Sequence, residues 1–264
     1  MPDASVKKTI LVALGVCLVC SILVSSAAVS MRSVQEANKR LDRITNILAA
    51  GDLRFDEKDV QAIYETKIKP MMIELGTGEI VREKNLNELL NIETFDIKSM
   101  ADSAEYGRAI SADDDIANIT RMPAYMVVYL VRENNRTKKI ILPIYGKGLW
   151  STMYGFISLD NDLKTIKGIT FYDHAETPGL GGEIDNPRWK SMWKGKQAFD
   201  KNGNLKVSVI KGMVDLSSPD AQYRVDGITG ATLTSRGVDN TVKFWLGNNG
   251  YGPFLKQLMV ELHG

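Results

Sequence analysis

The stretch DGITGATLTS, residues 226–235, is a loop of small and hydroxyl residues that leads directly into a helix. It holds four hydroxyl side chains and two glycines. A helical pattern follows at once, because Val238 and Val242 recur at the spacing of one helix face. Glycines let the backbone approach a ligand, and free N–H groups at a helix start favour an anion. The stretch fits either a phosphate-binding loop or a plain helix cap supplied by Thr234 or Ser235.

A second unusual stretch, HAETPGLGG, occupies residues 174–182. His174 and Glu176 make a weak metal pair, because no third ligand is in view. We expect a ligand-contacting loop at the end of a strand, with Leu180 as its apolar surface. The alternative is a structured turn before a helix that Asn186 opens.

A third stretch, YGKGLWS, covers residues 145–151. It lacks the Gly-Lys-Ser/Thr spacing of a P-loop. Trp150 fits a core position and the lining of a flat aromatic ligand equally well. The sequence has no Ser–His–Asp order and no nucleophile elbow, so a hydrolase is not supported.

Composition and charge narrow the classes of function. The hydrophobic fraction of 44% and the charged fraction of 25% are ordinary for a folded protein. A net charge of +1 argues against a nucleic-acid binder. Cys17 and Cys20 are the two cysteines, so the chain after them has no disulfide, thiolate nucleophile or cysteine metal site. Redox chemistry in this chain would need a bound cofactor.

Residues 9–29 carry no charge and are long enough to cross a bilayer as a helix. A cleaved signal peptide is the alternative, since Ser26-Ala27-Ala28 has the small residues that a signal peptidase requires. We favour an uncleaved anchor, because the apolar run exceeds the usual signal core. With either an anchor or a signal peptide, we expect the rest of the chain to be exported across the membrane. Cys17 and Cys20 lie on one face of this helix, where small packing residues are expected.

The chain after the anchor predicts an α+β fold. We expect strands over residues 124–132, 138–145, 150–159 and 165–172, joined as an antiparallel meander, and one more over 207–214. We expect helices over 32–50, 57–68 and 253–262, one opened by Asn186-Pro187, and one from about Ser235 to Gly247. Pro70 is expected to close the second of these, before a short hairpin around residues 76–78. The acidic residues 113–115 are expected in a solvated loop rather than at a cation.

The predicted fold is thus a single N-terminal transmembrane helix followed by an antiparallel-sheet domain with flanking helices. We divide the chain into an N-terminal segment with the transmembrane helix (1–31), a helical neck with the first part of the exported domain (32–122) and a cofactor domain (123–264).

The pattern Asp226-x-x-Thr229-Gly230-Ala231-Thr232-x-Thr234 resembles the flavinylation motif of the FMN-binding domains in bacterial respiratory complexes. Residues 174–181 and 148–151 are similar to two further segments of that family. The resemblance implies FMN bound covalently, through its phosphate, to the Thr232 hydroxyl. The phosphate would lie at the helix start, with Thr229 and Thr234 as hydrogen-bond donors.

The resemblance also implies a set of flavin-contacting residues and no catalytic acid, base or metal. The residues implied around the phosphate are Thr229, Gly230, Ala231, Thr232 and Thr234, and those around the rest of the flavin are Trp150, Ser151, Glu176, Thr177, Leu180 and Gly181. Leu180 and Trp150 are the candidates for packing the isoalloxazine ring.

Two families share this layout: the C subunit of the sodium-pumping NADH:ubiquinone oxidoreductase and the G subunit of the Rnf ferredoxin-linked complex. The long region over residues 55–122 favours the first, although Thr229 stands where that family often has Ser. The resemblance implies an electron carrier with five partner subunits, matured by a flavin transferase that uses FAD. It implies a single-pass protein of the bacterial inner membrane that faces the periplasm. A flavin-binding sensor module outside the cytoplasm is the alternative function.

Overall fold

The computed structural model describes residues 6–82, 90–134 and 136–263. The chain forms two compact units, with the boundary between Arg43 and Ile44. The first contains α1 (Val6–Ser30) and the beginning of α2 (Arg32–Ala50). Helix α1 is long and apolar enough to cross a membrane, which confirms the predicted apolar span. The bounds of α2 also match the prediction.

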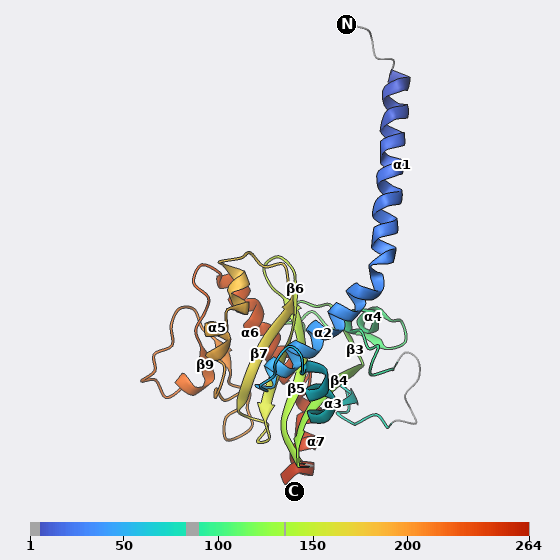
Figure 1. The fold of residues 1–264 in the computed structure, drawn as a ribbon. Coiled ribbons are helices and arrows are strands. Elements are labelled where there is room, and N and C mark those ends of the chain that lie inside the picture. The colour runs from blue at the N-terminus through green and yellow to red at the C-terminus, as the bar shows by residue number, and fades with distance from the viewer. Residues whose placement is uncertain (1–5, 83–89, 135, 264) are drawn as a thin grey trace. The chain divides into compact units, whose positions relative to one another are not determined.

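A five-stranded sheet forms the centre of the second unit (Figure 1). Its order is β1-β4-β5-β6-β7, and all neighbours are antiparallel. The strands are β1 (Ile68–Glu74), β4 (Tyr125–Glu133), β5 (Arg136–Lys147), β6 (Thr152–Asp160) and β7 (Ile166–Asp173). The predicted meander is therefore confirmed. Because β1 precedes residue 123 and pairs with β4, the segments 32–122 and 123–264 share one sheet.

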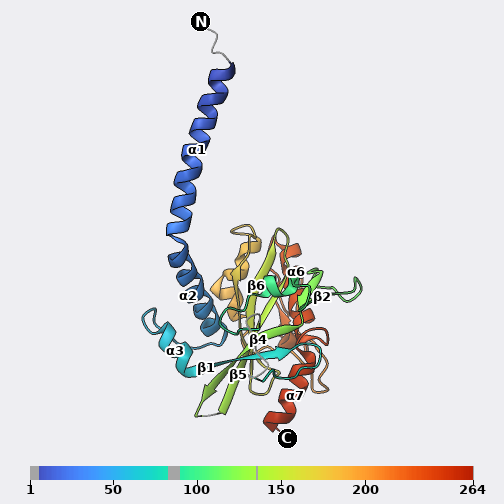
Figure 2. The same ribbon diagram turned by 90° about the vertical axis from the view of Figure 1, so that its right-hand side faces the viewer.

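Both faces of this sheet are covered. Figure 2 shows the last turns of α2 with α3 (Val60–Lys67) on one side, and α6 (Thr232–Leu246) with α7 (Gly252–His263) on the other. Residues 126–131 of β4 are all buried. A continuous apolar run of this kind is expected for a strand that packs on both faces. The core therefore has a layer on each side of the sheet.

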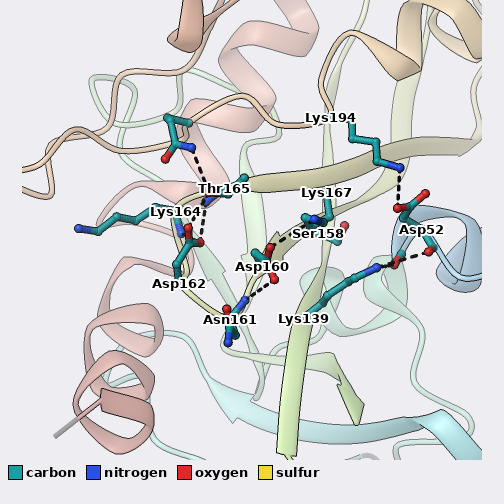
Figure 3. A network of polar contacts seen from close by, with 12 residues as sticks. Asp52, Lys139, Ser158, Asp160, Asn161, Asp162, Lys164, Thr165, Lys167 and Lys194 are labelled. Carbon is teal, nitrogen blue, oxygen red and sulfur yellow. Dashed lines mark hydrogen bonds and ion pairs between the residues drawn. The ribbon is translucent and has the colours of Figure 1, made fainter. Parts of the chain in front are cut away.

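Polar contacts fix the end of α2 to the sheet (Figure 3). The ammonium group of Lys139 donates to the carbonyl of Gly51 at 2.6 Å, and Lys194 forms an ion pair with Asp52 at 2.7 Å. The buried hydroxyl of Ser158 donates to the carbonyl of Ala50. Burial lowers the pKa of Lys139, against the opposing effect of Asp52. A cation at the C-terminal carbonyls of a helix is favourable, so these contacts anchor α2.

The predicted helix over residues 57–68 is shorter than expected. Helix α3 ends at Lys67, and Pro70 lies inside β1 opposite Tyr129. The prediction that Pro70 closes the helix is wrong because β1 is an edge strand, where the missing N–H of proline is tolerated. The expected hairpin around residues 76–78 is confirmed as a short one, with a bridge between Ile73 and Ile80 and hydrogen bonds from Glu74 N to Glu79 O and from Val81 N to Met72 O. Residues 83–89, within the long region that favoured one of the two families, lie outside the described residues.

The predicted strand over residues 207–214 is also shorter. Only Ser208–Val209 (β8) is strand, and it pairs in parallel with Arg224–Val225 (β9). Carboxylates take one N–H group inside β8 and one at the end of the predicted strand. Asp239 accepts from Val209 N and Asp226 accepts from Val214 N, each at 2.8 Å. Side-chain acceptors of this kind compete with ladder hydrogen bonds.

Shorter elements complete the unit. Helix α5 (Pro187–Ser191) is opened by Asn186, whose side chain accepts from Arg188 N, as predicted. Asp113 and Asp114 are exposed, whereas Asp115 is half-buried and accepts from the N–H groups of Ile119 and Thr120. The remaining elements are α4 (Ile97–Asp102), β2 (Gly107–Ala109), β3 (Arg121–Pro123), η2 (Gly181–Asp185) and η3 (Ala221–Tyr223).

Candidate flavin-binding site

Three loops of the predicted site meet at one end of the sheet. Strand β5 ends at Lys147, β6 begins at Thr152 and β7 ends at Asp173. Because these neighbouring strands are antiparallel, the three strand termini lie at the same end of the sheet. The turn 148–151 and the loop 174–180 are therefore adjacent, although more than twenty residues separate them in sequence. Helix α6 brings the third loop to the same place.

Glu176 joins these loops. Its carboxylate accepts from the N–H groups of Trp150 at 2.9 Å, Leu149 at 3.2 Å and Ser151 at 3.3 Å. The side chain of Ser151 in turn accepts from Ala175 N at 2.7 Å. Burial would raise the pKa of Glu176, but the hydrogen bonds from its hydroxyl and backbone donors outweigh burial and lower it. The structure therefore places Glu176 beneath the surface as a charged support.

The first turn of α6 differs from the prediction. The helix begins at Thr232 rather than near Ser235, and no side chain caps it. The hydroxyl of Thr234 donates to Glu176 at 2.5 Å, while that of Ser235 accepts from Ile228 N at 2.9 Å. The alternative of a helix cap supplied by Thr234 or Ser235 is therefore wrong, because both hydroxyls face inward and are buried. The Thr234 proton is also committed to Glu176 instead of facing a phosphate.

Thr232 lies at the surface, at the first position of α6. Thr229 and Gly230 are exposed beside it, whereas Ala231 is buried. Gly230 has a φ of +78°, a conformation that side chains rarely adopt, and a Cβ there would lie 3.0 Å from Leu180. The motif loop is therefore packed closely against the loop 174–180, with the Thr232 side chain open to a ligand.

Exposed apolar side chains lie in the loops that meet here. Trp150 is 65% exposed and Leu180 is 46% exposed, so neither belongs to the core. For Trp150 this excludes the core position that the sequence left open. Thr177 is exposed, and its carbonyl accepts from Leu180 and Gly182, which shapes the loop. Groups of large exposed apolar side chains are typical of binding surfaces.

A pocket of about 230 Å³ opens beside Thr232. Its lining includes Lys211 and Arg236, two cations that the sequence analysis did not single out. Arg236 follows Thr232 by four residues, so helical spacing could have placed it on the same face. Lys211 carries no local signal, because only the fold brings the loop after β8 to α6.

Two further predicted positions have structural roles. The His174 ring bonds to Asp185 at 2.7 Å through Nε2 and accepts from Glu176 N at 3.2 Å through Nδ1. No group of three or more possible metal ligands occurs in the residues that the structure describes. Asp226 fixes the motif loop, because its carbonyl accepts from the indole of Trp189 at 2.8 Å. Its carboxylate holds Val214 N at the same time.

These residues fit a flavin mononucleotide. A phosphate at Thr232 would meet the free N–H groups of a helix start, with two cations in the adjacent pocket. A flat ring would find exposed apolar side chains at Trp150 and Leu180. The site combines a helix start suited to an anion with exposed apolar side chains in the neighbouring loops.

Comparison with known proteins agrees with this geometry. Residues 148–247 match the family model described as FMN-binding domain, and the range contains all of the expected site residues. The chain is 44% identical to the C subunit of the Na(+)-translocating NADH-quinone reductase of Yersinia pestis, across 96% of this chain and 93% of that one. The corresponding protein of Pseudomonas aeruginosa is 43% identical, across 96% of both chains.

The chain belongs to the family formed by the C subunits of Na(+)-translocating NADH-quinone reductases. Solved structures agree. The crystal structure of Shewanella oneidensis NqrC has a TM-score of 0.76 at 34% identity and covers 85% of this chain and 99% of that chain. The crystal structure of the family member from Parabacteroides distasonis has a TM-score of 0.65 at 29% identity, across 85% of this chain and 96% of that chain. The predicted family is confirmed, and the relatives favour it over the Rnf family.

Proposed function

We propose that this chain carries FMN as a phosphoester on Thr232 and relays electrons between partner subunits of a sodium-pumping NADH:quinone oxidoreductase. The observation that carries the proposal is the exposed Thr232 at the first position of α6, in a pocket that Lys211, Arg236 and Asp239 also line. Membership in the NqrC family supports the proposal that the chain acts in this complex.

The position of Thr232 suits a phosphoester. The N–H groups of a first helical turn have no intrahelical acceptor, and the helix dipole favours negative charge there. The side chains of Lys211 and Arg236 line the same pocket and add positive charge. Thr229, exposed three residues earlier, is placed to donate a further hydrogen bond. Thr234 is not used, because its proton goes to Glu176.

The attachment is a transfer from FAD. The Thr232 oxygen forms a bond to the phosphorus on the flavin side of FAD, the bond from that phosphorus to the bridging oxygen breaks, and AMP leaves with the bridging oxygen. The hydroxyl proton goes to the base of the flavin transferase that catalyses the step. Covalent attachment removes the dissociation equilibrium, so the carrier keeps its flavin in a compartment that does not resupply it.

FMN, when bound, supplies electron acceptance and donation. The chain itself binds and orients the ring. Trp150 and Leu180 offer an apolar platform, and the turn and loop that carry them are held by the buried Glu176. No catalytic acid or base of this chain is required, since electrons pass through the ring. The NADH oxidation and sodium translocation belong to the whole complex.

The apolar helix α1 and membership in the family support the proposed location. We place this helix in the bacterial inner membrane and the second unit in the periplasm, as expected for an exported electron carrier. The partners are the other five subunits of the complex, with the flavin transferase during maturation.

The mass of the full-length chain tests the proposal. Chain purified from cells that hold the transferase is expected to carry one FMN minus water, and Thr232→Val is expected to lose it. Thr229→Val removes only a supporting hydrogen bond to the phosphate and keeps the acceptor, so this variant is expected to keep the covalent FMN. An unmodified wild-type mass favours a sensor module. Retained FMN in Thr232→Val would place the attachment elsewhere. The complex with Thr232→Val is expected to lose NADH-driven quinone reduction.

A further inference from the structure

Glu176 is a buried carboxylate without a cation. The residue is 4% exposed, and none of the ion pairs in the described part of the chain includes it. An isolated buried charge is costly in a protein, so the surroundings must compensate it in another way. A cluster of hydrogen-bond donors does this.

The donors come from two separate segments. Three successive N–H groups of the turn 149–151 point at the carboxylate, with distances from 2.9 to 3.3 Å. The fourth donor is the hydroxyl of Thr234 in the first turn of α6, at 2.5 Å. Backbone and hydroxyl donors stabilise the charge without cancelling it, unlike a lysine or an arginine. The site thus retains one full negative charge.

The packing around the carboxylate leaves no room for another group. A Cβ on Gly148 would lie 2.5 Å from Oε1 of Glu176, and a Cβ on Gly181 would lie 2.8 Å from Oε2. Such distances are well inside van der Waals contact. The charge is therefore fixed in place, and its distance from the surface above it is fixed with it.

That surface is the one that the proposed function assigns to the flavin ring. Trp150 contributes an exposed indole from the same residue whose N–H binds Glu176. Leu180 lies four residues after Glu176 in the same loop, and it is also exposed. The carboxylate therefore lies on the protein side of the apolar platform. An electron that enters a ring on this platform comes close to a permanent negative charge.

We infer that Glu176 is a positioning residue that also lowers the reduction potential of the bound flavin. It holds the Trp150 turn against α6, and its fixed charge disfavours added electrons on the ring, because charges interact strongly where water is excluded. The inference rests on the proposed function, since it requires FMN on Thr232. Beyond the proposed function, the inference assigns to Glu176 an effect on the reduction potential of the flavin.

The test uses full-length chain loaded with FMN, with the covalent mass checked first. Glu176→Gln keeps the size of the side chain and one acceptor oxygen, and it removes the charge. The midpoint potential of its flavin is expected to rise relative to that of the wild type. Glu183→Gln is the matched control. It removes a charge from the neighbouring η2 at a partly exposed side chain that accepts from Asn186, so a much smaller rise is expected.

Further variants separate charge from shape. Glu176→Asp keeps the charge and is expected to keep a low potential, even where the circular dichroism of the flavin shows a displaced ring. Equal potentials in wild type and Glu176→Gln, with FMN present in both, would overturn the inference and leave the proposed function standing. If the wild-type chain carried no FMN on Thr232, that result would instead disprove the proposed function.

A variant that keeps the carboxylate covers the case in which Glu176→Gln does not fold. Thr234→Val removes one donor and leaves the charge less stabilised. Its flavin is expected to have a potential below that of the wild type. An unchanged or raised potential in Thr234→Val would overturn the inference.

Discussion

The hydroxyl of Thr234 donates a hydrogen bond to the buried carboxylate of Glu176 at 2.5 Å, across 58 residues of sequence. Both residues are buried, at 0% and 4% exposure. The contact ties the first turn of α6, where Thr232 presents its hydroxyl, to the loop that carries Leu180. The proposed attachment point and the proposed ring-packing loop are therefore joined by a direct hydrogen bond.

Thr234→Val is expected to destabilise the chain. The substitution leaves Glu176 short of one donor, and loss of a hydrogen bond to a buried charge costs about 1.5–3 kcal/mol. Thr241→Val is the control, because Thr241 is equally buried on the same helix and donates only to the Gly237 carbonyl. Denaturant unfolding in detergent measures the difference. The FMN content is expected to stay unchanged, and a loss of less free energy in Thr234→Val than in Thr241→Val would contradict this account.

Glu176 is expected to make the domain sensitive to acid. Its pKa in the folded chain is below the ordinary value of 4.5. A lowered folded-state pKa adds stability above the unfolded-state value, and that stability is lost as pH falls through the folded-state value. Below about pH 4.5 the wild type should therefore lose unfolding free energy more steeply than Glu176→Gln. Parallel profiles for the two proteins, measured from about pH 7 to about pH 3, would show that the carboxylate is not stabilised.

Arg236→Gln is expected to slow flavin attachment. Arg236 lines the pocket beside Thr232, and in the proposed transfer its charge would attract the phosphates of FAD. The variant should show a lower initial rate of FMN incorporation with transferase and FAD, and a smaller effect in high salt. Arg188→Gln removes an exposed charge on α5 outside this pocket and serves as the control. Equal rates for both variants would remove Arg236 from the site.

Lys139→Met is expected to loosen the end of α2. The ammonium group donates to the Gly51 carbonyl at 2.6 Å, and a lost charged hydrogen bond costs about 1.5–3 kcal/mol. Amide exchange at Gly51 and Leu53 should become faster, since both N–H groups bond within the last turn. Lys167→Met, which breaks a partly exposed ion pair with Asp160, should cost about 1 kcal/mol or less. Unchanged exchange at Gly51 would contradict the anchoring role.

Local sequence patterns predicted the regular elements well where one physical signal dominated. The apolar run of α1 and the helical periodicity of α2 are properties of neighbouring residues, so their bounds could be read directly. The pattern failed at Pro70, because only the sheet order shows that this strand is at an edge. It failed again over residues 207–214, where only Ser208–Val209 is strand and the Asp226 carboxylate takes the Val214 donor.

The site residues show the same difference between local sequence patterns and tertiary structure. A sequence can show that residues 226–235 are rich in hydroxyls, but it cannot show which of them face water. The helix starts three residues earlier than the periodicity indicates, and this shift leaves Thr232 exposed and turns Thr234 inward.

The sequence by itself determined the apolar span, the antiparallel meander and the motif that points to Thr232, because each rests on residues close together in the chain. The tertiary structure alone decided that Trp150 is exposed, that Lys211 reaches the pocket and that Glu176 is a buried charge held by two distant segments. The physical reason is that these properties depend on contacts between residues far apart in the sequence. Burial and hydrogen-bond partners depend on which segments the sheet brings together, and no local spacing encodes that meeting.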